Sequence, residues 1–384
     1  MISIVGGGVI GLSIGWYLAK EGAKVTLFEE DVCGRDASWA SAGMLAPHLH
    51  SYPQSPGVTE TATLMLELEQ RSYSMWAAFS EELQQASGTD IGRRMGGSLA
   101  VGFSPDEESQ LKADYELQRE HGLDIQWLSA KEALEMEPAL SPSLVAASFS
   151  PLDGQVDPRS VLKALREAYL RAGGELREHC PVRSVEIEND RVRGIGTSDG
   201  TVPTDKVVVA AGAWSGQISG VPEAARPPVH PVKGQMVALG TDPQNRPLTH
   251  IVFGRGGYYI PRTDGRLVVG TTMEAAGFDT TNTVTGILGI LRRASETVPQ
   301  VGTLPIVEMW TGLRPRSTDG APVLGPTSVD GLVMATGHFH VGVVLAPITA
   351  QLIGRCLLDD KVPDAMAPFG IGRFQGAGPR TQAL

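Results

Sequence analysis

Three glycines near the N-terminus have the spacing of a dinucleotide-binding turn. Gly6, Gly8 and Gly11 lie between the apolar run 2–5 and a stretch with helical spacing, and Glu29 closes the next apolar run. In such a turn the first glycine permits the bend, the second admits a pyrophosphate, and the third lets the helix pack closely. The helix N-terminus offers unpaired N–H groups to the phosphates. Because Glu29 can bind an adenosine ribose but would repel a 2′-phosphate, the pattern predicts FAD or NAD and disfavours NADP.

Three further segments favour FAD over NAD. The small-residue stretch 35–47 follows the ribose site and suits an extended cofactor. The apolar run 206–211 ends in a Gly-Ala-Trp sequence, and 337–347 is a glycine-flanked turn before a helix. A helix that begins there could stabilise the negative charge of a reduced flavin. There is no second glycine motif for a nicotinamide donor, which argues against a reductase or a monooxygenase.

The family resemblance described below draws attention to a separate group of residues that could hold a substrate. Arg314, in Gly-Leu-Arg-Pro, can bind a carboxylate through two parallel hydrogen bonds, although a structural ion pair at a sheet edge is the alternative. Tyr258 can donate to the same carboxylate or serve as a packing aromatic. Met44 and Met273 are candidates for apolar walls near the flavin, or for core residues. His340 could line the pocket or tune the flavin, with a purely structural role as the alternative.

Neither the histidines nor the cysteines have the spacing of metal ligands. We therefore expect no metal site. Cys33, Cys180 and Cys356 are far apart in the sequence, so we expect three reduced thiols. The resemblance described below implies a non-covalent cofactor, because similar sarcosine oxidases bind flavin through a Cys before the final glycine segment and no Cys lies between Cys180 and Cys356 here.

Composition limits the classes of partner. The chain has 384 residues, a net charge of −11 and a pI near 5.3, which argues against nucleic acid and anionic membranes as partners. The start shows no features of a signal peptide, so we expect a cytoplasmic protein. The longest apolar run, 341–358, is interrupted by Pro347, Gln351 and Arg355, and this predicts a buried helix and no membrane span.

The pattern of elements indicates an α/β (α+β) fold of two interleaved domains. Helices are predicted at 12–21, 59–87, 106–121, 128–137, 157–172, 285–297 and after Gly342, and 31–56 is predicted to be loop. Buried strands are predicted at 2–5, 25–28, 206–211 and 331–335, an extended run at 95–103, and antiparallel strands at 235–239, 257–262 and 266–272. We therefore expect a Rossmann-like FAD-binding domain interleaved with an antiparallel-sheet substrate domain. The FAD-binding domain is predicted to comprise 1–85, 145–215 and 308–370, and the substrate domain 86–144 and 216–307. Residues 371–384 are predicted to form a C-terminal tail.

Several stretches together resemble a known family. Residues 4–11, 37–47 (ASWASAGMLAP), 231–235 (PVKGQ), 259–273, 312–315 (GLRP) and 337–347 follow one another in the family's order along the whole chain. They resemble the FAD-dependent amino-acid oxidases of the D-amino-acid oxidase superfamily, and most closely the glycine oxidases of thiamine biosynthesis. The resemblance implies a flavin domain and a sheet-based substrate domain, with the substrate lying over the flavin.

The resemblance also assigns roles to individual residues. Cofactor positions are matched by Gly6, Gly8, Val9, Ile10, Gly11, Glu29, Glu30, Ser38, Ala42, Gly43, Met44, Val182, Gly212, His338, Phe339, His340, Val341, Gly342, Val343 and Val344. Arg314 matches the residue that binds the substrate carboxylate, and Tyr258 and Met273 match pocket positions. Glycine oxidases carry Arg at the position of His340 and often His at that of Gly256. These changes remove donors from the pocket wall and leave open which small amino acid is the substrate.

The expected activity follows from this family. Hydride transfer from the substrate Cα to the flavin would yield an imine, which hydrolyses to a 2-oxo acid and ammonia, or to an amine for an N-alkylated substrate. Dioxygen would reoxidise the flavin and give hydrogen peroxide. The alternatives are a D-amino-acid dehydrogenase that passes electrons to a quinone, and a non-catalytic FAD-binding protein. A homotetramer or a dimer is the expected assembly, since relatives are often oligomeric.

Overall fold

A mostly parallel six-stranded sheet forms one half of the molecule. The computed structural model describes residues 1–47 and 60–375. The sheet order is β19 (Val323–Pro326), β20 (Leu332–Thr336), β13 (Lys206–Val209), β1 (Ile2–Val5), β2 (Val25–Phe28) and β9 (Glu175–Arg177), and only β19 runs antiparallel to its neighbour. This is the expected Rossmann-like order of strands around β1.

Successive residues of the central strands face two different layers. Ile4 and Val208 pack among the helices α1 (Val9–Lys20), α6 (Pro158–Arg171) and α8 (Ala346–Asp359). Val5 and Val207 pack on the opposite side, against a three-stranded sheet of β10 (Val182–Glu188), β11 (Arg191–Thr197) and β12 (Gly200–Pro203). Because both faces are covered, these strands are continuous apolar runs in the sequence.

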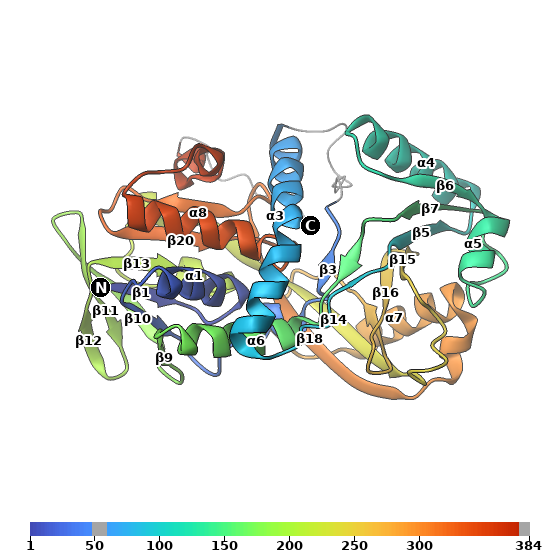
Figure 1. Ribbon diagram of the computed structural model, residues 1–384, viewed down its shortest axis with the longest axis horizontal. Coiled ribbons are helices and arrows are strands. Elements are labelled where there is room, and N and C mark those ends of the chain that lie inside the picture. The colour runs from blue at the N-terminus through green and yellow to red at the C-terminus, as the bar shows by residue number, and fades with distance from the viewer. Residues whose placement is uncertain (48–59, 376–384) are drawn as a thin grey trace.

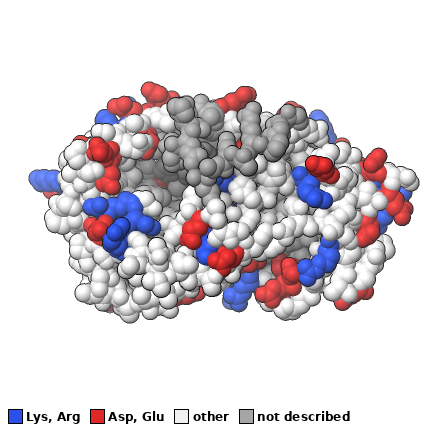
Figure 2. All heavy atoms as spheres, turned by 180° about the vertical axis from the view of Figure 1, so that it is seen from behind, with Lys and Arg blue, Asp and Glu red and all other residues white. Residues whose placement is uncertain are grey.

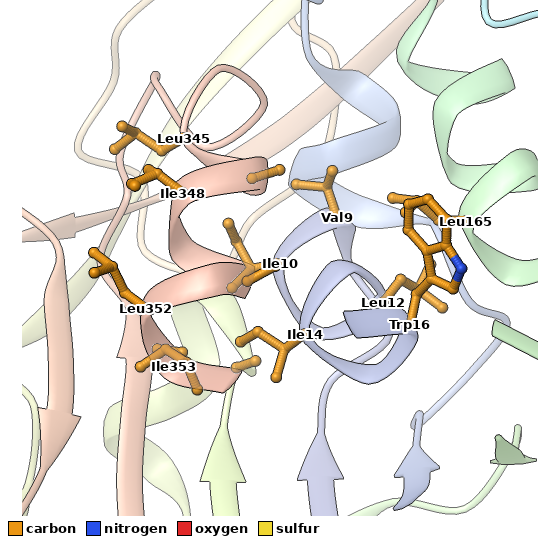
Figure 3. Close-up of a cluster of buried hydrophobic side chains, with 14 of the residues drawn as sticks. Val9, Ile10, Leu12, Ile14, Trp16, Leu165, Leu345, Ile348, Leu352 and Ile353 are labelled. Carbon is orange, nitrogen blue, oxygen red and sulfur yellow. The ribbon is translucent and has the colours of Figure 1, made fainter. Parts of the chain in front are cut away.

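Helix α1 is buried on two sides, as Figure 3 shows. Ile10 and Ile14 point toward Ile348 and its neighbours on α8, while Leu12 and Trp16 lie toward Leu165 of α6. A helix that is apolar on most of its circumference has to lie inside the protein. The buried helix predicted for the run 341–358 is confirmed in α8, which begins at Ala346.

The other half is an eight-stranded sheet (Figure 1). Its order is β18 (Ile306–Ser317), β14 (Val229–Gly240), β17 (Arg266–Gly270), β16 (Gly257–Pro261), β15 (Ile251–Gly254), β5 (Ser98–Gly102), β7 (Ala146–Ser150) and β6 (Gln126–Ser129). One face carries Val237 and Val269 and packs against α7 (Val284–Thr297) and α5 (Ala130–Met136). The opposite face carries Met236 and Val268 and packs against α2 (Asp36–Ala40).

The remaining elements connect the halves. Helix α3 (Glu60–Ser87) stands between them in Figure 1, and its Ser72 and Trp76 both donate to the carbonyl of Val344. A short sheet joins β3 (Met44–Leu45), β8 (Gly154–Gln155) and β4 (Arg94–Met95). The other helices are α4 (Pro105–Glu120) and the 3-10 helices η1 (Gly212–Gln217), η2 (Glu223–Ala225), η3 (Pro299–Thr303), η4 (Asp364–Phe369) and η5 (Ile371–Phe374).

Three local predictions are wrong in part. The predicted loop 31–56 contains α2 and β3 within its described residues, and the predicted helix 128–137 begins as strand β6. A Ser129 capping box starts helix α5 only at Ala130. The extended run 95–103 is divided between β4 and β5 at Gly96 and Gly97, where Gly97 has φ +84°. Strands β7 and β18 pair within the eight-stranded sheet. The predicted domain ranges place both strands in the FAD-binding domain. The domain boundaries stay a prediction.

A buried arginine joins the two halves. Arg262, at the end of β16, is 6% exposed and donates to the carbonyls of Ala42 and Val156, each at 2.6 Å, and to Gln155 Oε1 at 2.7 Å. Burial lowers the pKa of Arg262 to about 10, which leaves the guanidinium charged at neutral pH. Its acceptors lie on the segments that surround β3 and β8, so one side chain ties these segments to the eight-stranded sheet.

We expect Arg262→Leu to lower the free energy of unfolding by about 3 kcal/mol, because three buried oxygens lose a charged donor. Urea unfolding of the purified protein measures this change. Arg193→Leu is the matched control, since Arg193 is half exposed and pairs with Glu188 at 3.8 Å; we expect a change within about 0.5 kcal/mol. Equal stabilities of the two variants would contradict the prediction.

Candidate active site

A cavity of about 610 Å³ lies between the two large sheets. That volume is within the range of about 300–1,000 Å³ typical of ligand sites. The predicted site residues that line it are Gly6, Gly8, Val9, Ile10, Glu29, Glu30, Ser38, Ala42, Met44, Val182, Gly212, Tyr258, Met273, Arg314, His338, Phe339, His340, Gly342 and Val343. The tertiary structure therefore brings residues from both ends of the chain to one site.

At one end of the cavity the first glycine turn holds α1 close to β1. Gly6 has φ +106°, and a Cβ there would lie 2.5 Å from the carbonyl oxygen of Ala210. A Cβ on Gly11 would lie 1.9 Å from the carbonyl oxygen of Gly6. Both positions therefore require glycine, the first for backbone conformation and space and the second for close packing.

The N-terminus of α1 faces the cavity. The Val9 N–H donates to Ser38 Oγ at 3.0 Å, and the N–H groups of Ile10 and Gly11 are too early in the helix for an intrahelical acceptor. A Cβ on Gly8 would meet only Ser38 Oγ, at 3.1 Å, and one on Gly212 would meet nothing within 4 Å. Gly8 and Gly212 thus leave open space in the cavity that the helix N-terminus borders, which fits a diphosphate.

Glu29 occupies the position expected of the ribose acceptor. It follows β2, and its Oε2 accepts from the Gly7 N–H at 2.7 Å while Oε1 accepts from the Asp31 N–H at 3.1 Å. These contacts fix the carboxylate at the wall of the cavity, where Glu30 and Val182 also lie. A carboxylate that accepts hydrogen bonds can bind the adenosine ribose, and the helix N-terminus beside it can bind the phosphates, so the two together fit FAD.

Arg314 lies on β18 at the other end of the site. Its Nη2 donates to Thr271 Oγ1 at 2.7 Å and its Nη1 to the Thr272 carbonyl at 3.3 Å. A Cβ on Gly234 would lie 2.4 Å from the Arg314 guanidinium, so the glycine of the neighbouring strand provides its space. No carboxylate of residues 1–47 or 60–375 forms an ion pair with Arg314, which leaves its charge available to a ligand.

Tyr258 lies beside this guanidinium. A Cβ on Gly270 would lie 2.6 Å from the Tyr258 ring, and the hydroxyl donates to Met236 Sδ at 3.2 Å. Burial raises the pKa of Tyr258, although Arg314 and Thr271 act in the opposite direction. The side chain is therefore a neutral phenol at neutral pH and can donate a hydrogen bond.

The two histidines of the C-terminal turn differ. His338 is buried, its Nε2 lies 3.2 Å from Thr349 Oγ1, and burial lowers its pKa to about 3, so the imidazole is neutral. His340 is exposed at the cavity wall and its ring meets that of Phe339 at 4.5 Å between centroids. Met273 is 58% exposed, so it borders the opening and is not a core residue.

Four predicted cofactor positions do not line the cavity, namely Gly11, Gly43, Val341 and Val344. They support its wall. Gly43 has φ +67° and faces the Val156 carbonyl, and the Val344 carbonyl binds α3. Other lining residues were not predicted, among them Trp214, Gly234, Met236 and Thr271. Gly234 within a strand was an available signal, since glycine in a strand often marks a close approach.

The described residues form neither a metal site nor a membrane-spanning helix. Residues 1–47 and 60–375 contain no group of His, Cys, Asp or Glu that could hold a metal ion. In the same part of the chain no helix is long and apolar enough to cross a membrane. On the face in Figure 2, acidic and basic side chains are interspersed over a largely uncharged surface.

The comparisons with known proteins agree with this geometry. The family model for FAD dependent oxidoreductases (DAO) matches residues 1–355. A glycine oxidase from Geobacillus kaustophilus is 33% identical, covering 98% of this chain and 97% of that protein, and one from Bacillus subtilis is 34% identical with 96% of each covered. The crystal structure of glycine oxidase from Geobacillus kaustophilus superimposes with a TM-score of 0.87, covering 98% of this chain and 99% of the other.

The cavity thus contains a turn that fits a dinucleotide and, on the larger sheet, the guanidinium of Arg314. The family match covers most of the same sequence. The chain belongs to the DAO family of FAD-dependent oxidoreductases.

Proposed function

We propose that the protein oxidatively deaminates glycine or small D- or N-methyl amino acids. The observation that carries this proposal is the guanidinium of Arg314, which has no carboxylate partner among the described residues and lies beside the Tyr258 hydroxyl. A cation in a partly closed cavity is stabilised by a carboxylate ligand, and a guanidinium can bind it with two hydrogen bonds. The glycine oxidases among the relatives support a small amino acid as the ligand.

The residues around the glycine turn are proposed to hold FAD. Gly8, the N-terminus of α1 and Ser38 would surround the diphosphate, and Glu29 with Val182 would hold the adenosine. The turn from His338 to Val343 would border the flavin ring. When bound, FAD supplies the acceptor for the hydride that leaves the substrate Cα.

The chain's own residues would position the substrate for this step. Arg314 would bind the carboxylate, and Thr271 and Thr272 hold the guanidinium in place from the other side. Tyr258, kept neutral by its raised pKa, would turn its single O–H from Met236 Sδ to the carboxylate and so donate a second hydrogen bond to it. Two fixed contacts to the carboxylate hold one end of a small molecule in place and limit the positions open to its Cα, and positioning of this kind accounts for much of the rate of such reactions.

The proposal also covers the electron acceptor, the cellular location and the oligomeric state. We infer dioxygen as the electron acceptor, because the relatives are oxidases; a quinone is not favoured. A cytoplasmic location is supported by the free thiols of Cys33, Cys180 and Cys356. A dimer or tetramer is supported by large apolar side chains that stay exposed on α7 and β18, among them Val284, Leu288 and Val307.

We expect Gly8→Leu to yield a folded protein without FAD, because the new side chain would occupy the open space beside the α1 N-terminus. The flavin content of the purified protein and its circular dichroism measure this outcome. Gly96→Leu is the matched control, since a Cβ at Gly96 meets nothing within 4 Å and that residue does not line the cavity. A yellow Gly8→Leu protein with full flavin content would refute the assignment.

We expect Arg314→Ala to lower kcat/KM for the best amino-acid substrate by about 30- to 5,000-fold, or roughly 2–5 kcal/mol, because the carboxylate loses its charge partner. Peroxide release measures the rates, and flavin content should stay unchanged. Arg355→Ala, on the exposed side of α8, is the control and should keep full activity. If Arg314→Ala retains wild-type kcat/KM, the proposed substrate site is wrong.

A further inference from the structure

A second hollow lies outside the main cavity and shares a wall with it. Its volume is about 380 Å³, and it is lined by residues of η1, the proline-rich stretch 227–231 and Phe278. Ala213 borders both spaces. Trp214 lines the main cavity, whereas Phe278 lines the outer hollow, and the two rings meet with centroids 5.4 Å apart. The aromatic pair therefore separates the cavity from the outside at this point.

The segment that carries Phe278 also carries the residues that hold Arg314. Thr271 and Thr272 accept hydrogen bonds from the guanidinium, and Met273 lines the cavity. Phe278 follows a few residues later and is 39% exposed. One short segment, 271–283, thus runs from the proposed carboxylate site to the aromatic wall.

Two buried side chains of β14 fix this segment. Lys233 is 1% exposed; its Nζ lies 2.8 Å from Asp279 Oδ2, and its backbone exchanges two hydrogen bonds of 3.0 Å with Glu274. Gln235 is fully buried and donates to Glu274 Oε1 at 2.8 Å and to Thr283 Oγ1 at 3.0 Å. The hydrogen bonds from Lys233 and Thr281 hold the pKa of Asp279 well below its usual range, so the ion pair persists at neutral pH.

This anchoring gives the wall its rigidity. Most side chains of 274–283 are exposed, and exposed segments of this kind usually move unless they are tied down. Moving the segment away would leave the buried ammonium of Lys233 without its partner, which is costly. Phe278 is therefore held against the Trp214 ring on the side of the outer hollow, where it opposes an outward turn of Trp214.

We propose that Phe278, held in place by the Lys233–Asp279 ion pair, sets the largest substrate side chain that the cavity admits. Phe278 acts through Trp214 and is a positioning residue for substrate size. The inference rests on the proposed amino-acid oxidase activity, and it names the residue that would confine this activity to amino acids with no side chain or a very short one. Branched and aromatic amino acids would be excluded by the fixed wall.

The first test compares Phe278→Ala with Phe278→Leu in the FAD-loaded enzyme. The readout is kcat/KM for glycine, D-alanine, D-valine and D-phenylalanine, together with Kd values for straight-chain carboxylates from acetate to hexanoate, measured through the absorbance of the bound flavin. Leu358→Ala is the control, because Leu358 is 41% exposed at the end of α8, close to the 39% of Phe278, and lines neither hollow.

We expect Phe278→Ala to raise the ratio of kcat/KM for D-valine to that for glycine by about tenfold or more, in line with the discrimination that a filled apolar pocket provides. Phe278→Leu should give a smaller rise, and Leu358→Ala none. Activity with glycine and flavin content should stay at wild-type levels. An unchanged ratio in Phe278→Ala would overturn the proposal.

The carboxylate series separates this inference from the proposed function. If the wild-type enzyme oxidises none of the amino acids, the proposed function fails, and the affinity for hexanoate relative to acetate decides the role of Phe278 alone. A higher relative affinity for hexanoate in Phe278→Ala supports the size limit, and an unchanged one rejects it.

The second test addresses the anchor. Asp279→Asn should relax the size limit in the same direction as Phe278→Ala, with unchanged flavin content, and Asp279→Glu should restore part of it. Asp124→Asn, at an exposed acid after α4, is the matched control. A wild-type substrate profile in Asp279→Asn would show that the ion pair does not hold the wall.

Discussion

The contact on which the site depends is the buried guanidinium of Arg262. The side chain follows strand β16 of the eight-stranded sheet and donates to backbone and side-chain oxygens of the two segments around β3 and β8. Leu45 and Val156 of these segments pack in the core that contains α1 and α6 of the other half. Arg266, on the next strand, reaches the same region through Asp157 at 2.6 Å. Asp157 in turn caps the first turn of α6. A charge buried among neutral oxygens is stable only if all of them stay in place, so this junction fixes how the two sheets face each other.

The alternation of residues along each strand decides which side chains face the cavity between the two sheets. On β14 the residues Gly234 and Met236 face the cavity, while Lys233 and Gln235 face the opposite layer and hold the segment 271–283. The same period-two pattern places Tyr258 in the cavity and Tyr259 in the core beneath α7. A shift of one residue in the pairing would exchange these roles.

Glycines in the strands provide the space for the polar side chains of the site. Gly234 lies under the Arg314 guanidinium and Gly270 under the Tyr258 ring. Each glycine is on the strand next to the residue that it accommodates, so the site is built across strand pairs. The resulting cation has hydrogen-bond partners but no described carboxylate partner, which is why a carboxylate ligand is the chemistry that best completes it.

The sequence by itself determined the dinucleotide turn, the acid after the second strand, the buried parallel strands and the family, because each depends on residues that are close in the chain or on a strict local pattern. It also supplied Arg314, Tyr258 and Met273 as candidates through the resemblance. Only the tertiary structure decided that Gly11, Gly43, Val341 and Val344 support the wall from behind, and that Trp214, Thr271 and Gly234 belong to it. Those roles depend on which strands become neighbours and which face each residue occupies. The junction at Arg262 and the anchor at Lys233 join residues 220 and 46 positions apart, respectively, and no local pattern encodes such pairs.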